Sequence, residues 1–250
     1  MFLRILSTSL LLTSLVYSFI SLDPPEIGEK EKLDAEIALS ANISAGNTDT
    51  KSAGLAIKGQ YNGEEWLTYL IAAYHYGEVN KDKNTNDGLA HLRYVHAIAD
   101  TAYDYEFFLQ SEFNEFQDIK KRNLAGANIR RKINLPFDKF YVGLGLFYSY
   151  LEPEAVSEFN PIYKQTKINS YISMSHNINE HFNITYLGFY QVTADDIADL
   201  RIFQILQLNT ALTTHVGLSF DIKHEYNKTP YQNIEKNDIR STISLKYKFN

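Results

Sequence analysis

The chain has 250 residues, 44% of them hydrophobic and 14% aromatic, with a formal net charge of −6 at pH 7. This mildly acidic balance gives no basis for nucleic-acid binding, which requires a basic surface. Because the chain has no cysteine, disulfides, thiolate metal sites, a cysteine nucleophile and a lipid-bearing N-terminal cysteine are all excluded.

The first residues have the features of an export signal. Arg4 supplies a positive charge, residues 5–16 form a short apolar run, and small residues suit cleavage after Ser18 or after Ser21. The apolar run is shorter than the roughly 20 residues that a membrane helix needs. We therefore predict a signal peptide over residues 1–18 and an exported protein without a helical anchor.

A charged segment that contains prolines follows the signal, with the sequence LDPPEIGEKEK at residues 22–32. We interpret residues 19–32 as a solvated, periplasmic lead-in. No second linker interrupts the remaining sequence, so residues 33–250 are expected to form one domain.

From residue 33 onward the dominant period is two, which is typical of half-buried β-strands. In residues 33–45 every odd position is apolar, and residues 140–151 alternate in the same way. The opposite faces carry hydroxyl, amide, glycine and charged residues. We expect about twelve strands, near residues 33–45, 52–61, 66–79, 88–98, 102–114, 121–133, 140–151, 164–176, 182–193, 201–212, 215–226 and 238–249.

The connections between these strands alternate in length. Asn62-Gly63 is a strong hairpin signal, and the other short turns fall at residues 99–101, 135–139, 177–181 and 213–214. Longer polar stretches lie between them, at residues 80–87, 115–120, 152–163, 194–200 and 227–237. If neighbouring strands are antiparallel, all short turns lie at one end and most long loops at the other, which is typical of outer-membrane barrels.

Three features favour a membrane barrel over a soluble sandwich. The strands exceed the roughly 5–6 residues of ordinary sheets and reach the about 9–11 that a tilted membrane strand needs. Aromatic residues gather near strand ends, as in the belts at membrane surfaces. A cation on the lipid face costs roughly 2–4 kcal/mol near the bilayer centre, so we expect the charges of the polar faces in the lumen: Lys58, Glu106, Arg130, Lys167, Asp221, Arg240 and Lys246.

Two strands depart from this pattern. Residues 66–79 are apolar on both faces, and Arg131 has lipid-facing parity near a short turn, from which its guanidinium can reach the headgroups. A closed barrel leaves no strand edge exposed to lipid. The predicted fold class is therefore all-β: a transmembrane antiparallel β-barrel of about 12 strands, with short periplasmic turns and longer extracellular loops.

Several short stretches, in this order, resemble one family. They are Gly46-Asn-Thr-Asp-Thr50 after an alternating strand, Tyr74-His-Tyr-Gly-Glu78, Tyr103-Asp-Tyr105, and residues 112–122 with Gly126. The chain resembles the salt-induced outer membrane proteins, the family catalogued as DUF481, over essentially the whole mature sequence. Its glycine-rich stretch after Arg122 is thinner, and its closing aromatic, Phe249, is penultimate. The resemblance implies an outer-membrane location, and it brings no catalytic residue and no known substrate.

The turn within the first of these stretches is a candidate site. Gly46, Asn47, Thr48 and Asp49 are residue types that tolerate turn geometry. No helix follows whose N-terminus could hold a phosphate. We interpret these residues as a hairpin turn on the outer side, with a weak cation site at Asp49 and Thr48 as the alternative.

A second candidate is the run from acidic residues to arginine. Glu112 and Asp118 flank a predicted hairpin loop, and Arg122 starts the returning strand, so Arg122 can pair with Glu112 inside the barrel mouth. We interpret Arg122 and Glu112, with Asp118 as the second acid beside the loop, as a charge group at the barrel mouth whose buried pair fixes the strand register. The alternative is a constriction that contacts a ligand or selects ions, because rings of charge set pore selectivity.

The histidines suggest neither a metal site nor a catalytic base. His75 and His91 would be close cross-strand neighbours in a regular hairpin, but two ligands do not make a metal site. No histidine is followed two positions later by serine, the spacing that places a base and a nucleophile on one strand face. We predict no enzyme, no metal and no cofactor.

The main functional hypothesis is an outer-membrane β-barrel that acts as a narrow pore or as a structural part of the envelope, linked by the family name to osmotic response. Two alternatives stay open: a barrel enzyme that acts on lipid or peptide, and a soluble periplasmic β-protein that binds an apolar ligand. The expected partners are outer-membrane lipid and lipopolysaccharide, the barrel insertion machinery and periplasmic chaperones, with no nucleic acid.

Overall fold

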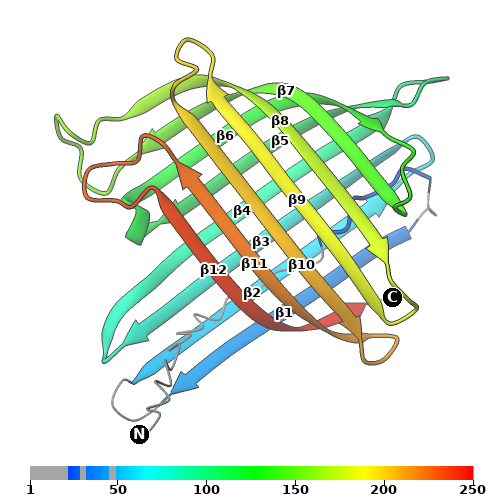
Figure 1. The fold of residues 1–250 in the computed structure, drawn as a ribbon, viewed down its shortest axis with the longest axis horizontal. Helices are drawn as coiled ribbons and strands as arrows, with labels where there is room; N and C mark the ends of the chain where they lie inside the picture. Colours follow the sequence, from blue (N-terminus) through cyan, green and yellow to red (C-terminus); the bar gives the residue numbers. More distant parts are fainter. Residues whose placement is uncertain (1–21, 29–31, 45–48, 250) are drawn as a thin grey trace, which may run out of the picture.

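The protein, seen here as a computed structural model, is described over residues 22–28, 32–44 and 49–249. Within these residues twelve strands, each antiparallel to its neighbours, close into a barrel in which β12 returns to pair with β1 (Figure 1). No helix in this part of the chain is long and apolar enough to cross a bilayer. The predicted antiparallel barrel of about twelve strands is confirmed.

Each predicted strand is present, with bounds that differ by a few residues. The strands are β1 (Lys32–Ser44), β2 (Thr50–Asn62), β3 (Trp66–Val79), β4 (Asp82–Ala97), β5 (Tyr103–Asn114), β6 (Ile119–Lys132), β7 (Lys139–Glu152), β8 (Tyr163–Asn177), β9 (Phe182–Thr193), β10 (Leu200–Ala211), β11 (Val216–Asn227) and β12 (Asn237–Phe249). A short 3₁₀ helix, η1 (Glu115–Gln117), joins β5 to β6. The Asn114 side chain caps it by accepting the N–H groups of Phe116 and Gln117.

The two faces of each strand differ as a period of two requires. In β7, Phe147 is 2% exposed, whereas its neighbours Leu146 and Tyr148 are 54% and 48% exposed on the outside. Other large apolar side chains that are exposed around the barrel include Leu39, Leu55, Leu70, Leu92, Phe107, Leu109, Ile129, Ile172, Tyr190, Ile222 and Ile243. A belt of this extent would promote aggregation in water, whereas lipid is the solvent that suits it.

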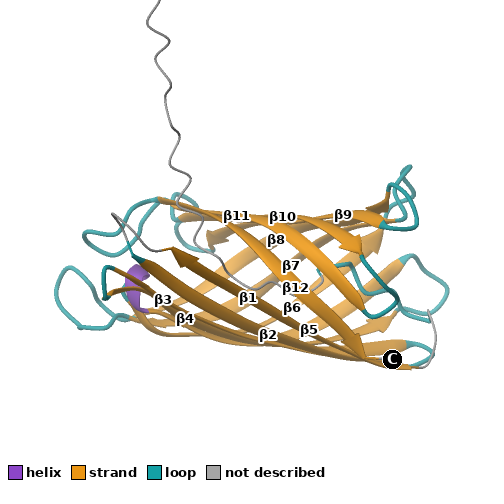
Figure 2. Cartoon of the chain, turned by 90° about the horizontal axis from the view of Figure 1, so that it is seen from below, coloured by secondary structure: helices purple, strands orange, loops and turns teal. Residues whose placement is uncertain are grey.

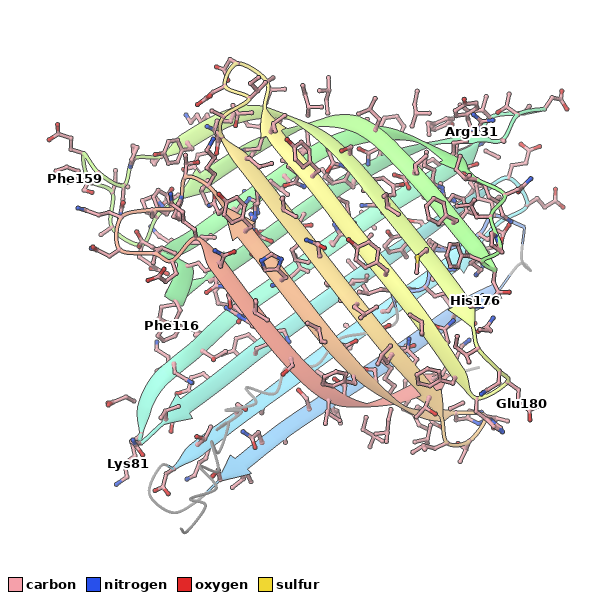
Figure 3. All side chains as sticks on the ribbon, in the orientation of Figure 1. Lys81, Phe116, Arg131, Phe159, His176 and Glu180 are labelled. Atoms are coloured by element: carbon pink, nitrogen blue, oxygen red, sulfur yellow. The ribbon has the colours of Figure 1, made fainter. Side chains whose placement is uncertain are left out.

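The connections define two ends of the barrel, called here the loop end and the turn end. The loop end holds Asp49 and connections 80–81, 115–118, 153–162, 194–199 and 228–236, and the turn end holds 63–65, 98–102, 133–138, 178–181 and 212–215. Figure 2 shows η1 and the end of β12 at opposite ends. Lys81, Phe116 and Phe159 lie at the loop end, and Arg131, His176 and Glu180 at the turn end (Figure 3).

The expected long loop at residues 80–87 is wrong. Asn80 and Lys81 have φ of 52° and 72°, as in the two-residue turns that match the twist of a hairpin, and β4 begins at Asp82 opposite Val79. The polar residues that suggested a loop instead extend the ladder. Lys83 pairs with Glu115 of η1 at 2.5 Å, so polar side chains support the strand where it approaches the loop end.

The two irregular strands have clear places in the barrel. β3, which is apolar on both faces, turns Leu67, Ile71 and Ala73 inward and gives the lumen an apolar side. Arg131 points outward at the turn end, where its guanidinium lies 5.2 Å from the centroid of the Tyr103 ring (Figure 3). A cation over an aromatic face near the membrane surface is compatible with a lipid-facing wall.

Candidate functional site

The inner face of the barrel carries many charged side chains. The structure places on it the charges predicted for the lumen: Lys58, Glu106, Arg130, Lys167, Asp221, Arg240 and Lys246. They face inward because their strands alternate, and a buried charge is tolerated only when it has partners. The partners of these side chains therefore determine what the lumen can do.

The predicted hairpin pair is present in the geometry. Glu112 and Arg122 stand opposite each other in the ladder between β5 and β6, and Arg122 Nη1 donates to Glu112 Oε1 at 2.7 Å. Asp118 does not join them. Its backbone is in the left-handed region at φ 54°, and its side chain accepts hydrogen bonds from the Glu154 N–H at 3.1 Å and from Asn160 at 2.7 Å, both in connection 153–162.

Glu112 also meets a residue from the far wall of the barrel. Arg201, at the start of β10, places Nη1 3.8 Å from Glu112 Oε1, with β6, β7, β8 and β9 between the two strands along the wall. The same guanidinium donates to Glu225 of β11 at 2.9 Å, and Lys223 pairs with Glu225 as well. We call Glu112, Arg122, Arg201 and Glu225 the cross-lumen cluster. Sequence reasoning missed Arg201 and Glu225.

A second contact crosses the lumen at the same end. Arg240 of β12 lies 3.2 Å from Asp87 of β4, and its Nε donates to Asp238 at 2.9 Å. Gln117 of η1 donates to Asp238 at 3.1 Å. These bonds brace the walls near the cross-lumen cluster.

The expectation that His75 and His91 are close cross-strand neighbours is wrong. The register between β3 and β4 places His75 opposite Asp87 and His91 opposite Ile71. His75 Nδ1 lies 2.8 Å from Asp87 Oδ2, and His91 Nδ1 lies 2.9 Å from Gln110 Oε1. In the part of the chain that the structure describes, no group of three His, Cys, Asp or Glu side chains could hold a metal ion.

A different charged group lies in the wall, nearer the turn end. Glu106, which is 1% exposed, accepts hydrogen bonds from Tyr171 at 2.7 Å and from Asn128 at 3.2 Å. Its Oε1 lies 3.5 Å from Arg93 Nη1 and 3.8 Å from Arg130 Nε. We call Arg93, Glu106, Arg130 and Tyr171 the wall cluster, because β4, β5, β6 and β8 supply it from one side of the barrel.

Aromatic rings surround the cations of the wall cluster. The Arg93 guanidinium lies 6.0, 5.6 and 5.8 Å from the ring centroids of Tyr69, Phe108 and Tyr171. The Arg130 guanidinium lies 4.3 Å from that of Tyr141. Such cation–π contacts are worth about 2 kcal/mol when desolvated, so this cluster is packed into the wall as a core would be.

Two cavities lie end to end in the lumen. The inner cavity, about 260 Å³, is lined by the wall cluster, by apolar side chains such as Ile71 and Phe203, and by residues 22–25. The outer cavity, about 250 Å³, lies beneath the loops. Each is many times the roughly 10–15 Å³ that one water molecule needs. The residues that line both are Gln117, Ile119, Arg122, Arg201 and Glu225. Arg122, Arg201 and Glu225 of the cross-lumen cluster therefore lie where the two cavities adjoin.

Two loop-end connections fold together over the outer cavity. Tyr231, 6% exposed, donates to the Pro161 carbonyl at 3.1 Å and stacks on Tyr163 with ring centroids 5.7 Å apart. The Gln232 N–H donates to Asn160 Oδ1 at 2.8 Å. Burial raises the pKa of the Tyr231 phenol above its ordinary value, so it stays a donor. Connections 153–162 and 228–236 form one lid.

Asp199 ties this lid to the lumen. Lys167 donates to it at 2.8 Å, and the hydroxyls of Thr193 and Thr229 donate to it as well. Burial alone would raise the pKa of the Asp199 carboxyl, yet these three hydrogen bonds hold its pKa below the ordinary 3.8. The charged form is therefore the one that the folded lid needs.

The turn end is occupied by the N-terminal segment, residues 22–28. Pro24 is fully buried, the Leu22 N–H donates to Gln207 Oε1 at 3.2 Å, and Lys139 donates to Asp23 at 2.9 Å. Lys132 pairs with Glu26. The expectation of a solvated lead-in is therefore wrong for this segment, because lysines at the start of β7 and the end of β6 bind its carboxylates at the rim and Pro24 is buried in the lumen.

The other predicted lumen charges have local partners. Lys246 donates to Asn209 at 2.9 Å, and Ser219 donates to Asp221 at 3.0 Å. The Lys58 ammonium lies 5.8 Å from the centroid of the Tyr69 ring. None of these three charges belongs to the cross-lumen cluster.

Most of the predicted outer turn, Gly46, Asn47 and Thr48, lies outside the described residues. Asp49 is described, and it is joined to the β3–β4 turn at the loop end. Its N–H donates to Asn80 Oδ1 at 2.9 Å, and its carbonyl accepts the Asn80 N–H at 2.7 Å.

Comparisons with known proteins add a family but no activity. The sequence profile described as "Protein of unknown function, DUF481" matches residues 37–249. A search of curated proteins finds no match for the chain.

Several solved structures match the chain at low sequence identity. The NanC porin is 11% identical with a TM-score of 0.46 and covers 87% of this chain and 98% of its own. The translocator domain of the autotransporter NalP from Neisseria meningitidis is 11% identical with a TM-score of 0.48, over 89% of this chain and 91% of its own. The KdgM porin is 10% identical with a TM-score of 0.45, over 87% and 99%.

Proposed function

The chain belongs to the DUF481 family, and from that premise we propose that it is an outer-membrane barrel that serves as a narrow, gated pore, closed in this structure. One observation carries the proposal: ion pairs of the cross-lumen cluster join two walls of the barrel where two cavities of the same lumen adjoin. We infer that this cluster is a partition across the lumen. A barrel that served only as scaffold would have no need for hollow space on both sides of a polar partition.

The surface of the barrel supports the membrane part of this proposal. A closed ladder pairs the backbone groups that lipid cannot satisfy, and the outer face is apolar around the wall. The predicted signal peptide fits export, and the proposed surroundings are outer-membrane lipid and lipopolysaccharide. Insertion would depend on periplasmic chaperones and the barrel insertion machinery, as for other barrels of this kind.

The chemistry of the partition suits a gate. Arg201 has two carboxylate partners on different walls, Glu112 and Glu225, so a small shift of one side chain exchanges partners without leaving a charge alone. Ions that compete for these charges weaken the pairs, although burial limits the screening. This dependence supports a link between pore opening and the salt concentration, which we include in the proposal.

We assign the barrel no catalytic step. The buried carboxylates of the cluster are engaged by arginine, rather than oriented toward a base and a nucleophile. Charged side chains of both signs line the lumen, and rings of charge in a pore determine which ions or small solutes pass.

Single-channel recording in a planar bilayer tests the proposal. Arg201→Gln removes the central cation while keeping the length and polarity of the side chain, so we expect discrete conductance steps where the wild-type barrel stays silent or opens rarely. Arg131→Gln on the outer wall is the matched control and should behave as wild type. If Arg201→Gln folds, as judged by heat-dependent gel mobility, and is silent across a range of voltages and salt concentrations, the pore proposal fails and a structural role in the envelope is favoured.

A further inference from the structure

The N-terminal segment, residues 22–28, lies where a soluble leader has no reason to lie. It enters the lumen at the turn end, its residues 22–25 line the inner cavity, and Pro24 is fully buried. Ordering an extended segment costs backbone entropy at every residue. Specific contacts must offset that cost.

The contacts are charge-complementary and come from several strands. Lys139 at the start of β7 donates to Asp23 at 2.9 Å, and Lys132 near the end of β6 pairs with Glu26. Both lysines stand next to the same turn, 133–138, so one part of the rim holds both acids. Farther around the wall, Gln207 of β10, separated from β7 by β8 and β9, accepts the Leu22 N–H at 3.2 Å. The segment is therefore anchored at the rim and reaches inward to a second part of the wall.

Its residue types suit this position. Pro24 and Pro25 have no N–H to satisfy and favour an extended backbone, so the segment can cross an apolar cavity with few unmet hydrogen bonds. The two acids lie on either side of the prolines, where the rim lysines can reach them.

We propose that residues 22–28 are a built-in plug that narrows the turn end of the lumen and is held there by Lys132 and Lys139. This inference rests on the proposed pore, and it adds a second obstruction in series with the cross-lumen cluster. The cluster closes the loop-end half and the segment narrows the turn end. Removal of the segment alone leaves the cluster closed, and its effect on current is visible only after the cluster is opened.

Thiol labelling tests the position of the segment without any need for conduction. Because the chain has no cysteine, Pro24→Cys gives a single reactive site, and Glu64→Cys at the exposed β2–β3 turn is the control. With a membrane-impermeant maleimide we expect Pro24→Cys to react at least about tenfold more slowly than Glu64→Cys, as for a protected site. Lys132→Glu with Lys139→Glu should abolish the protection. Equal labelling rates in the unmodified background would overturn the proposal.

Conductance tests the plug itself. In the Arg201→Gln background, Lys132→Glu with Lys139→Glu should raise the unit conductance by about twofold or more, since a lumen obstruction limits ion passage. Adding Asp23→Lys with Glu26→Lys restores charge complementarity and should return the conductance to that of Arg201→Gln alone. Deletion of residues 22–28 is the second variant, with the effect expected to match the lysine reversal.

The two proposals fail in different ways. If Arg201→Gln conducts and neither the deletion nor the lysine reversal adds to the current, the plug is wrong and the pore stands. If no variant conducts while Pro24→Cys stays protected until the lysines are reversed, the pore is wrong and the segment's anchoring is structural.

Discussion

The lumen contains two clusters of ion pairs that have similar residues but different places in the barrel. In the wall cluster, Glu106 and its partners come from one side of the barrel and are enclosed by aromatic rings. In the cross-lumen cluster, Arg201 joins walls that are separated by β6, β7, β8 and β9. The first is part of the wall, and the second stands in the passage.

The difference lies in what each group would do if it were broken. Loss of a wall-cluster partner leaves buried charge in a packed region, so the free energy of unfolding falls. Loss of a cross-lumen partner frees a side chain between two cavities that hold space for water. Stability should therefore respond to the wall cluster, and conduction to the cross-lumen cluster.

The largest expected effect on stability is at Glu106. Glu106→Gln leaves Arg93 and Arg130 without their shared carboxylate, and breaking a buried ion pair by removing one partner costs about 3–5 kcal/mol. Urea unfolding of the barrel in lipid vesicles measures this cost. Glu112→Gln in the cross-lumen cluster, where side chains border two cavities, should cost clearly less. Equal costs would remove the distinction between the clusters.

A comparison of the two faces of β3 should give the next largest effect. Ala72→Lys places a cation on the outer wall and should cost roughly 2–4 kcal/mol if lipid covers it. Ala73→Lys, one residue along, points into the inner cavity and should cost less. The positions of both clusters depend on which face of each strand points into the lumen. A larger loss of stability for Ala73→Lys than for Ala72→Lys in the same unfolding assay would contradict that assignment.

A smaller effect is expected at Arg93. Arg93→Lys keeps the charge but loses the planar group that lies against Tyr69, Phe108 and Tyr171. The expected loss is about 0.5–2 kcal/mol, the range of cation–π contacts, with no change in conductance. A conducting Arg93→Lys barrel would mean that the wall cluster also obstructs the passage.

The smallest effect, local to the lid, is a dependence on pH. The pKa of folded Asp199 lies below the ordinary 3.8, so its stabilising charge is fully present above that pH and is lost as the pH falls through the folded pKa. We expect hydrogen exchange of residues 228–236 to quicken in that acidic range. Asp199→Asn should show the quicker exchange already at neutral pH, without the acid step. An unchanged pH profile in Asp199→Asn would show that another group controls the lid.

The sequence is sufficient to predict which side chains face the lumen and which pairs form within one hairpin, but not which strands meet across the lumen. Period two placed Lys58, Arg130 and Lys246 on the inner face because alternation is a local property of a strand. The Glu112–Arg122 pair can also be predicted from the sequence, because the two residues face each other across one hairpin.

The missed features depend on the closed shape of the barrel. Arg201 and Glu225 had the inward parity, but their meeting with Glu112 follows from the diameter and stagger of the barrel, which no local pattern contains. The charged, proline-containing composition of residues 22–28 is typical of a solvated segment. Its partners, Lys132 and Lys139, lie more than a hundred residues away, so no local pattern reveals them. The polar start of β4 resembled a loop for a related reason: water at the end of the barrel allows a strand to be polar.

The measurement that tests the central claim most directly is single-channel conductance of two matched double variants, each with confirmed folding. Glu112→Gln with Arg201→Gln opens the cross-lumen cluster, and Arg93→Lys with Tyr171→Phe perturbs the wall cluster while the barrel keeps its fold. The first should conduct in discrete steps, and the second should stay as quiet as wild type. If both are silent, or if both conduct alike, the cross-lumen cluster is not the closure of this lumen.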